Sequence, residues 1–442
     1  QPKTEYTDIF DHPTIFAGQG RSEKLDILKK FLDQNEIDHY FVSGLDNIAW
    51  LLNLRADDIK YTPLLYSYLL ISKNNKHSLY IKESAMPEIL KKEIQTLINI
   101  NNIENIRSIF NNNNSSETIG LDFNSTTYYF LDLLRKQKIN TKNLANPCIL
   151  LKAIKNETEL DGAKKAHIRD GVSITKYIYW LKNIMDPKSN DEISVAHHLE
   201  NLRRKNELFH SLSFDTISAI DKNAALPHYR VTEEGKSSFS DNNIYLVDSG
   251  AQYFDGTTDI TRTIILGEAT REQKDRFTRV LKGHIALSNH VFDKGTKGTD
   301  IDYLARKSLQ EINLDYDHGT GHGIGSFLSV HEAPQRIAKK SMFESVELLP
   351  GMILSNEPGY YKENEYGIRT ENLVVIKENS DKKLYFENIS WCPIDLDLID
   401  SSMLDQIERH WLNKYHKKVY DKLEKYLEDK ERDWLKDATS EV

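Results

Sequence analysis

Residues 244–266 read IYLVDSGAQYFDGTTDITRTIIL, and this stretch decides the architecture of the second half of the chain. Two β-forming runs flank a turn signal, FDG at 254–256, and the pattern predicts a β-hairpin. Folding the hairpin about its middle, near residues 253–254, brings Asp248 and Asp259 roughly opposite each other. Carboxylates that face each other across a hairpin repel. Because Asp248 follows an apolar run and should be buried, we expect a cation between them; a solvent-exposed pair is the alternative.

A second pair of carboxylates lies in residues 354–376, LSNEPGYYKENEYGIRTENLVVI. Two strand-like runs surround a polar turn, with Glu357 at the end of the first run and Glu371 before the second. Glu371 stands between Arg369 and an apolar strand, where an unpaired charge is costly. Glu371 therefore needs a partner, whereas the acids of the turn itself are expected to be solvated.

Glycine occupies every second position in residues 318–325, HGTGHGIG, and two of the positions between are histidines. The stretch does not match the dinucleotide fingerprint, because Ile324 stands where a glycine is required, and it lacks the lysine of a P-loop. So many glycines disfavour a long helix, so we expect a strand or turn that leaves room around His318 and His322.

Together these segments offer four carboxylates and one or two imidazoles. That is too much negative charge for a single zinc ion, which prefers four ligands with nitrogen or sulfur. The set suits two divalent ions, with Mn²⁺, Co²⁺ or Fe²⁺ ahead of Zn²⁺. Two such ions side by side can activate water and polarise a carbonyl, so metal-assisted hydrolysis is the predicted reaction class.

Composition excludes several other classes of protein. The chain has 442 residues and a net charge of −9, which gives no electrostatic bias toward nucleic acid or anionic membranes. No apolar run reaches the ~18 residues of a membrane helix, and the first residues lack the apolar core of a signal peptide. Only Cys148 and Cys392 are present, so a reducing compartment, the cytoplasm, is expected.

Helix and strand signals divide the chain into parts. We expect residues 1–20 to be a linker or the remainder of a preceding domain, 21–148 an α/β domain, and 149–442 a second domain. A long amphipathic helix closes the chain, and its apolar stripe is expected to pack against the body or a partner subunit. The stripe consists of Leu404, Ile407, Trp411, Tyr415, Val419 and Leu423.

Five motifs in this order, VDSG, TTDITRT, HGTGHGIGSFLSVHE, NEPGYY and GIRTEN, resemble the pita-bread metallopeptidases, specifically aminopeptidase P of the larger cytosolic type. The resemblance covers nearly the whole chain. It implies an α/β (α+β) fold, with a creatinase-like N-terminal α/β domain followed by a pita-bread catalytic domain. Members of this type carry a further domain ahead of the one expected at 21–148, so we expect a fragment or a shorter relative.

The resemblance also implies cofactors, partners and site residues. It implies two divalent ions, usually Mn²⁺, and peptide substrates from which the N-terminal residue is removed when proline stands second. The apolar stripe near the C-terminus, rather than the resemblance, leads us to expect a homodimer. The implied metal ligands are Asp248, Asp259, His322, Glu357 and Glu371. The residues that match the non-ligand histidines of the active site are His228, His318 and His331.

These roles give a mechanistic hypothesis. A metal-bridging hydroxide attacks the carbonyl of the Xaa-Pro bond, Glu357 handles the proton, and His331 or His318 donates a hydrogen bond to the oxyanion. Arg369 orients a ligating carboxylate. The predicted substrate-binding residues are Phe214, His228, His331, Tyr361 and Arg369, with Phe214 and His228 shaping the proline pocket.

Several related activities are alternatives. An Xaa-Pro dipeptidase shares the ligands but accepts only dipeptides, and a methionine aminopeptidase usually lacks an N-terminal α/β domain. A creatinase hydrolyses without metal, and a non-catalytic pita-bread binding protein has generally lost ligands. None of the five ligands is missing from this sequence, which favours the metallopeptidase.

Overall fold

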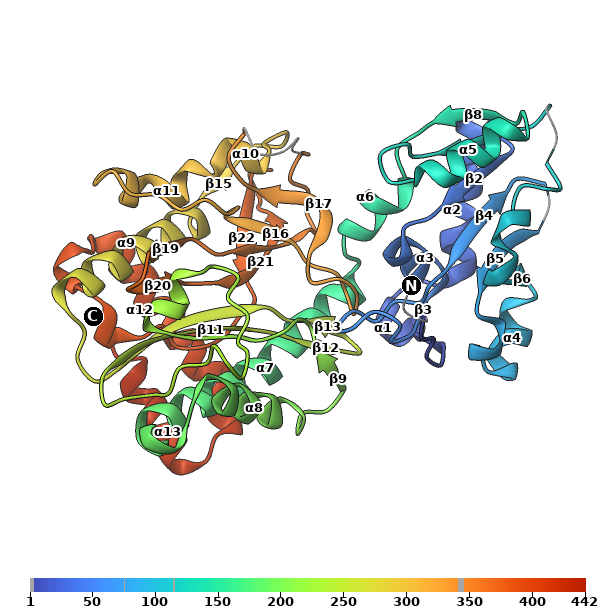
Figure 1. The fold of residues 1–442 in the computed structure, drawn as a ribbon. Helices are drawn as coiled ribbons and strands as arrows, with labels where there is room; N and C mark the ends of the chain where they lie inside the picture. The colour runs from blue at the N-terminus through green and yellow to red at the C-terminus, as the bar shows by residue number, and fades with distance from the viewer. Residues whose placement is uncertain (1–3, 75, 114–115, 341–345) are drawn as a thin grey trace. The chain divides into compact units, whose positions relative to one another are not determined.

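The computed structural model describes residues 4–74, 76–113, 116–340 and 346–442 (Figure 1). The chain divides into two compact units. The N-terminal unit comprises residues 1–152 and 156–159, and the C-terminal unit comprises residues 153–155 and 160–442. The domain boundaries predicted from the sequence, at 20 and 148, stay predictions.

A six-stranded mixed sheet organises the N-terminal unit, in the order β6-β5-β4-β2-β7-β8. Its strands are β2 (His39–Val42), β4 (Tyr68–Ser72), β5 (His77–Ile81), β6 (Ile98–Asn102), β7 (Thr118–Leu121) and β8 (Asn140–Asn143). β4 and β5 form an antiparallel pair, whereas β2–β7, β5–β6 and β7–β8 are parallel pairs. Parallel pairs need crossover connections, and the short helices of this unit supply them.

The helices of the N-terminal unit are α1 (Thr14–Ala17), α2 (Arg21–Gln34), α3 (Leu45–Leu52), α4 (Glu88–Ile94), α5 (Tyr128–Lys136) and most of α6 (Pro147–Ala153), with 3₁₀ turns η1 (Glu83–Ala85) and η2 (Ile103–Ser108). A two-stranded ribbon joins β1 (Phe10–Asp11) to β3 (Leu54–Arg55). The aromatic rings of Phe41, Phe110 and Phe130 meet in the core, with centroids of Phe41 and Phe130 4.7 Å apart. This is an α/β unit of ordinary size.

The C-terminal unit combines several antiparallel sheets with helices. The helices are α7 (Glu157–Asn183), which begins in the N-terminal unit, α8 (Glu192–Arg203), α9 (Arg271–Ser288), α10 (Gly298–Ile301), α11 (Tyr303–Gln310), α12 (Gln406–Leu423) and α13 (Asp429–Ala438). The 3₁₀ turns are η3 (Pro187–Ser189), η4 (Asp221–Ala225), η5 (Leu396–Leu398), η6 (Ser401–Met403) and η7 (Glu424–Tyr426). Among the described residues, no helix combines the length and apolar character needed to cross a membrane.

The strands of this unit form three sheets and one separate hairpin. Two three-stranded sheets have the orders β10-β11-β14 and β13-β12-β9, a six-stranded sheet has the order β15-β22-β21-β18-β16-β17, and β19 pairs with β20. Their bounds are β9 (Phe209–Leu212), β10 (Ile217–Ile220), β11 (Asn243–Ser249), β12 (Ala251–Tyr253), β13 (Gly256–Thr257), β14 (Ile260–Leu266), β15 (Val291–Phe292), β16 (Gly321–Gly323), β17 (Glu332–Ile337), β18 (Ile353–Asn356), β19 (Gly359–Lys362), β20 (Tyr366–Arg369), β21 (Asn372–Glu378) and β22 (Leu384–Asn388).

The hairpin at 244–266 exists, but its predicted register is wrong. Asp248 pairs with Thr261, and Asp259 lies just before the paired residues of β14. The reason is the turn at Phe254 and Asp255, across which Tyr253 pairs with Gly256, so that the turn is centred one residue later than expected. Asp259 is thus the diagonal neighbour of Asp248, and diagonal neighbours still share one face of a sheet.

The two glutamates of the second cluster stand at a junction between two hydrogen-bonded ladders. β18 and β21 end their pairing at Asn356–Asn372, and β19 and β20 end theirs at Gly359–Arg369. Glu357 and Glu371 lie directly beyond the last pair of the β18–β21 ladder, at corresponding positions on its two sides. β16, which contains His322, lies beside β18 in the same sheet.

The predicted amphipathic helix forms as α12, but it does not close the chain, because α13 follows it, and its buried stripe is narrower than expected. Leu412, Tyr415, Val419 and Leu423 are buried in the largest apolar cluster of the C-terminal unit. Ile407 was wrongly assigned to the stripe, since it is 70% exposed at the first turn of the helix. The buried residues of the stripe pack within the chain itself.

Close packing of α9 along α11 gives a test of the fold (Figure 1). A Cβ atom added to Gly283 of α9 would lie 2.1 Å from the carbonyl oxygen of Ala305 in α11. We therefore expect Gly283→Ala to lower the free energy of unfolding by about 1–3 kcal/mol, measured by denaturant titration. The control is Ala286→Gly on the exposed face of α9, which loses about 1 kcal/mol of helix propensity. If propensity decided both sites, Gly283→Ala would instead stabilise the protein.

Candidate metal centre and active site

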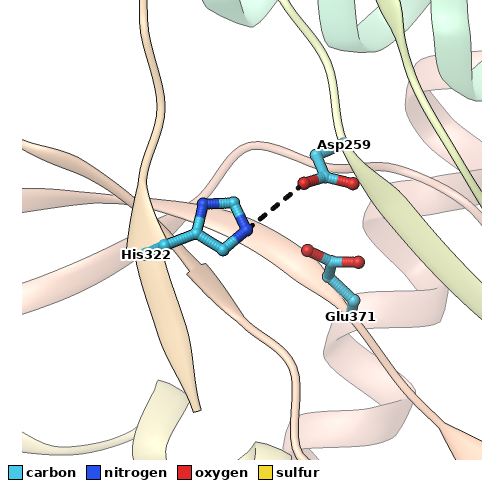
Figure 2. A group of neighbouring side chains, drawn as sticks. All are labelled: Asp259, His322 and Glu371. Carbon is cyan, nitrogen blue, oxygen red and sulfur yellow. Dashed lines mark ion pairs between the residues drawn. The ribbon is translucent and has the colours of Figure 1, made fainter. Parts of the chain in front are cut away.

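Strand ends bring the five predicted ligands together. Asp259, His322 and Glu371 each offer an atom within 4.8 Å of the others (Figure 2). His322 Nε2 lies 3.5 Å from Asp259 Oδ2 and 3.3 Å from Glu357 Oε1. Asp248 is close enough for its charge to raise the pKa of Asp259, Glu357 and Glu371. Residues that the sequence separates by more than a hundred positions thus converge on one volume.

The carboxylates of this cluster are buried with unsatisfied oxygens. In the part of the chain that the structure describes, Asp248 Oδ1, Asp259 Oδ1 and Glu371 Oε1 have no hydrogen-bond partner. Burial first, and then the neighbouring carboxylates, raise the pKa of Asp259 and Glu371 well above the ordinary values. Burial also raises the pKa of Glu357 to about 7. Several buried anions without a cation are unfavourable, so the cluster calls for bound positive charge.

The imidazole of His322 is oriented so that one ring nitrogen can also bind a cation. Its Nδ1 lies 3.0 Å from the carbonyl oxygen of Gly323, which can only accept, so Nδ1 carries the proton. Nε2 therefore presents a lone pair to the carboxylates, and burial lowers the pKa of His322 to about 4. Four oxygen donors and one neutral imidazole fit two hard or borderline divalent ions.

In two of the carboxylates, those of Asp248 and Glu371, one oxygen accepts a hydrogen bond from a side chain, and the other has no partner among the described residues. Arg369 Nη2 donates to Asp248 Oδ2 at 2.6 Å, and the other oxygen of Asp248 is the unsatisfied one. Thr261 Oγ1 donates to Glu371 Oε2 at 2.7 Å, and Arg369 Nε donates to Thr261 at 3.2 Å. Hydrogen bonds to ligating carboxylates fix the orientation of the free oxygen toward a metal.

His318 and Tyr361 form a hydrogen-bonded pair beside the cluster. His318 Nδ1 lies 2.8 Å from the carbonyl oxygen of Gly319, so it donates, and His318 Nε2 lies 2.8 Å from the Tyr361 hydroxyl. Burial and the nearby Arg369 lower the pKa of His318 to about 3, so the ring is neutral and accepts from Tyr361. Arg369 Nη1 in turn donates to the Tyr361 oxygen at 2.6 Å. Both nitrogens of His318 are therefore engaged.

The remaining candidate residues lie at the edge of the cluster. The ring of His331 meets that of His322 edge to face, with centroids 4.2 Å apart, and burial lowers the pKa of His331 to about 4. His228 is exposed, yet its charge lowers the pKa of His331. Phe214 is half-buried and packs against an apolar cluster that includes Val330, so it has a structural role whatever else it does.

Three family models match the chain. They are the creatinase/prolidase N-terminal domain over residues 1–159, metallopeptidase family M24 over 161–378 and the C-terminal region of peptidase M24 over 382–442. A Sordaria macrospora protein named probable Xaa-Pro aminopeptidase P is 40% identical over 447 residues, covering 96% of this chain and 72% of that protein. The chain belongs to metallopeptidase family M24. A Pyrenophora teres f. teres protein of the same name is 38% identical, covering 100% of this chain and 70% of its own length.

Solved structures agree with this placement in family M24. X-prolyl aminopeptidase of Caenorhabditis elegans, described as a cytosolic enzyme with a di-nuclear active site, is 32% identical with a TM-score of 0.93, covering 100% of this chain and 74% of that one. Prolidase of Pyrococcus horikoshii shares the fold at 24% identity and a TM-score of 0.66, over 85% of this chain and 99% of its own. The predicted family and the predicted fold, a creatinase-like domain followed by a pita-bread domain, are confirmed.

Sequence reasoning missed two hydroxyl residues of this M24 site. Thr261 hydrogen-bonds Glu371, and Ser355 Oγ donates to Glu357 Oε1 at 3.0 Å while accepting from the backbone N–H of His322 at 2.9 Å. Each hydroxyl lies two residues from a candidate ligand, Thr261 after Asp259 and Ser355 before Glu357. Residues two apart on a strand share a face, so that spacing was a usable signal.

Replacing one carboxylate tests both the destabilisation that the cluster causes without metal and its role in binding metal. We expect Asp259→Asn to raise the melting temperature of the metal-free protein, because it removes one of several repelling buried anions. We also expect the variant to lose most of the stabilisation that added Mn²⁺ gives the unchanged protein, measured by calorimetry with and without the ion. Asp397→Asn, at a side chain 70% exposed, changes the net charge equally and should do neither. An Asp259→Asn protein that keeps its full response to Mn²⁺ would contradict the ligand assignment.

The stability of the metal-free protein should fall as the pH rises. The pKa of Glu357 is raised from 4.5 to about 7 in the folded chain, so the folded protein favours the protonated form. That contribution is fully present below pH 4.5 and is lost as the pH rises through 7. We expect the melting temperature without metal to decrease from pH 5 to pH 8, and Glu357→Gln to flatten the decrease. Saturating Mn²⁺ should remove the effect, because ions bind the deprotonated carboxylates.

Proposed function

We propose that the protein is an Xaa-Pro aminopeptidase, a metal-dependent exopeptidase that removes the N-terminal residue from peptides with proline in second position. The convergence of all five candidate ligands carries this proposal. It is supported by relatives 38–40% identical that are named Xaa-Pro aminopeptidase P. The Caenorhabditis elegans enzyme with a di-nuclear active site supports it as well.

The ligand roles go to Asp248, Asp259, His322, Glu357 and Glu371. Two divalent ions held by this set would supply Lewis acidity, polarising a carbonyl and lowering the pKa of water. Glu357 is placed to take a proton from the attacking water and to return it to the departing proline nitrogen. Arg369 holds Asp248 and, through Thr261, orients Glu371.

The histidines divide the remaining work. The Xaa-Pro bond is a tertiary amide without an N–H, so the site must recognise the proline ring and the carbonyl. We assign the hydrogen bond to the oxyanion to His331, since both nitrogens of His318 are occupied by Gly319 and Tyr361. His228, exposed beside His331, is assigned with Phe214 to the proline pocket, and Tyr361 to substrate binding.

The alternatives are less well supported. The similarity to prolidase of Pyrococcus horikoshii is 24% and extends to the fold alone, whereas aminopeptidase relatives are much more similar over the whole chain. A non-catalytic binding protein is disfavoured because every candidate ligand is present and directed at the same volume. Substrate length separates the two enzymes experimentally.

Finer features are also proposals. We propose Mn²⁺ as the resident ion, from the oxygen-rich ligand set, with Co²⁺, Fe²⁺ and Zn²⁺ as the alternatives. A cytoplasmic location is supported by the two unpaired, buried cysteines and by the cytosolic Caenorhabditis elegans enzyme. Homodimerisation was expected from the apolar stripe of α12, and the packing of the buried stripe residues within the chain removes that support. The domains 21–148 and 149–442 are proposed on the helix and strand signals of the sequence.

The assay that tests the function compares an Xaa-Pro-Xaa tripeptide with the matching Xaa-Pro dipeptide. We expect Mn²⁺-dependent release of the N-terminal residue from the tripeptide, much slower cleavage of the dipeptide, and loss of both after chelation. Glu357→Gln should lower kcat by at least about 10²-fold, the size of a general acid–base contribution. Preference for the dipeptide would establish a prolidase, and no cleavage with metal bound would favour the binding protein.

A further inference from the structure

The segment that carries His318 has no regular backbone partners of its own. α11 ends at Gln310 and β16 begins at Gly321, so residues 315–320 connect the two without forming a helix or strand. Backbone carbonyls that lack ladder partners must be satisfied by other groups when they are buried. In this segment a single side chain, Arg306 of α11, donates to two of those carbonyl oxygens, those of Tyr316 and His318.

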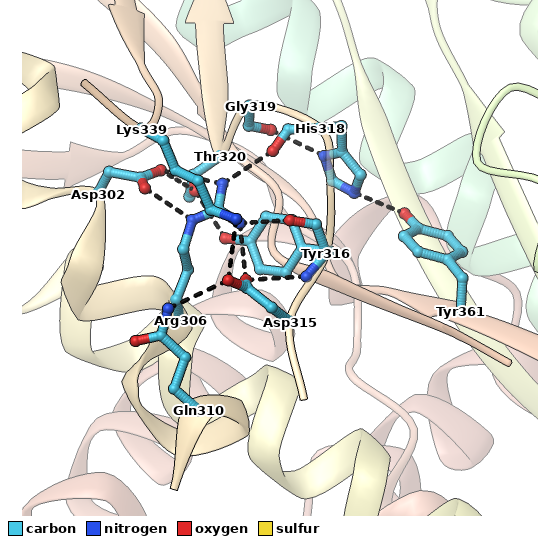
Figure 3. Close-up of polar contacts among 10 residues, drawn as sticks. All are labelled: Asp302, Arg306, Gln310, Asp315, Tyr316, His318, Gly319, Thr320, Lys339 and Tyr361. Atoms are coloured by element: carbon cyan, nitrogen blue, oxygen red, sulfur yellow. Dashed lines mark hydrogen bonds and ion pairs between the residues drawn. The ribbon is translucent and has the colours of Figure 1, made fainter. Parts of the chain in front are cut away.

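Arg306 holds the segment through a five-way contact (Figure 3). Its guanidinium donates to the carbonyl oxygens of Tyr316 at 2.6 Å and His318 at 2.8 Å. It also donates to Asp302 Oδ2 at 2.7 Å and to Asp315 Oδ1 at 2.9 Å, and it lies 3.9 Å from the centroid of the Tyr316 ring. The planar fork of arginine suits such simultaneous contacts, and a lysine could not reproduce them.

The charges of this arrangement balance. Lys339 pairs with Asp315 Oδ2 at 2.9 Å, so two cations face two carboxylates. The Arg306 side chain is only 1% exposed, and a buried charge of this kind is tolerated when it is paired and hydrogen-bonded on all sides. We call Asp302, Arg306, Asp315, Tyr316 and Thr320 the Arg306 cage.

The cage connects to the metal cluster through Thr320. The Thr320 hydroxyl donates to Asp302 Oδ1 at 2.5 Å and lies 2.6 Å from the Tyr316 hydroxyl. The carbonyl oxygen of the same residue accepts the backbone N–H of Glu357 at 2.9 Å. On the other side, the Tyr316 ring lies 4.8 Å from that of His318. The same set of contacts therefore holds both His318 and the backbone that leads to His322.

We propose that Arg306, Asp302 and Thr320 are positioning residues for the peptidase reaction, which hold His318 against Tyr361 and align the backbone entering β16. The inference rests on the proposed function. It assigns a catalytic consequence to residues that touch neither metal nor substrate. A misplacement of about 1 Å in a positioned group can lower a rate about 10²-fold, so even a small relaxation of the segment should be measurable in turnover.

Thr320→Val is the cleanest variant, because removing a charged partner of the cage would destabilise the whole fold. Valine keeps the shape of threonine and removes only the hydroxyl that bridges Tyr316 and Asp302. The matched control is Thr278→Val. The Thr278 hydroxyl is also buried, donates to the Lys274 carbonyl oxygen at 2.7 Å and accepts from the Asp400 backbone at 2.9 Å, but it belongs to no part of the site.

The experiment measures kcat and KM on an Xaa-Pro tripeptide, bound Mn²⁺ per chain and the melting temperature for both variants. We expect Thr320→Val to lower kcat about 10-fold, with KM within about twofold and Mn²⁺ content unchanged. Thr278→Val should lower the melting temperature by a similar amount and keep its kcat. A kcat for Thr320→Val equal to that of Thr278→Val would overturn the proposal, because a purely structural hydroxyl acts on stability alone.

A second measurement does not depend on activity. In protein labelled with ¹⁵N-histidine, with the His318 signal identified by its loss in His318→Gln, NMR reports which ring nitrogen carries the proton. We expect the Nδ1–H form in the unchanged protein and in Thr278→Val, and a mixture of tautomers in Thr320→Val. An unchanged His318 signal in Thr320→Val would overturn the proposal. If no peptide is cleaved by any variant, the proposed function fails, while the His318 signal still decides whether the cage positions the ring.

Discussion

Electrostatic repulsion among buried carboxylates is the constraint on which the C-terminal unit depends. Asp248, Asp259, Glu357 and Glu371 surround His322, and none of them lies beside another in the sequence. Repelling groups stay together only where a rigid scaffold holds them and a counter-charge is available. The antiparallel ladders provide the scaffold, since every candidate ligand stands in a strand or next to the end of one. Arg369 provides part of the counter-charge, and divalent ions would provide the rest.

Anchoring one oxygen of a carboxylate while leaving the other open recurs across the site. Arg369 anchors Asp248, and Thr261 anchors Glu371; the second oxygen of each is unsatisfied among the described residues. His322 shows the same pattern, since the Gly323 carbonyl oxygen accepts from Nδ1 and thereby leaves Nε2 as the nitrogen with a free lone pair. His318 differs because both of its nitrogens are engaged, Nδ1 by the Gly319 carbonyl oxygen and Nε2 by the Tyr361 hydroxyl.

The gathering of the candidate ligands was largely predictable, because acids that interrupt apolar strands are conspicuous and the motifs occur in the order of the family that the chain resembles. The register of the first hairpin was not, since a turn centred one residue later pairs Asp248 with Thr261 instead of Asp259. The exposure of Ile407 was missed because helical spacing does not reveal where the neighbouring elements end. The Arg306 cage was invisible for another reason. Its carbonyl acceptors belong to the backbone, and no residue type in the sequence marks them.

The junction of the two ladders has a consequence for how this chain can vary. Glu357 and Glu371 lie where one ladder ends and the β19–β20 hairpin begins, and the exposed tip of that hairpin, residues 363–365, lies beyond the last paired residues. The β18–β21 ladder fixes the positions of these two candidate ligands. Matched residues can therefore be added to or removed from the two strands of the β19–β20 hairpin without moving either glutamate. The reach of this hairpin can thus change in evolution while the positions of the two glutamates stay fixed.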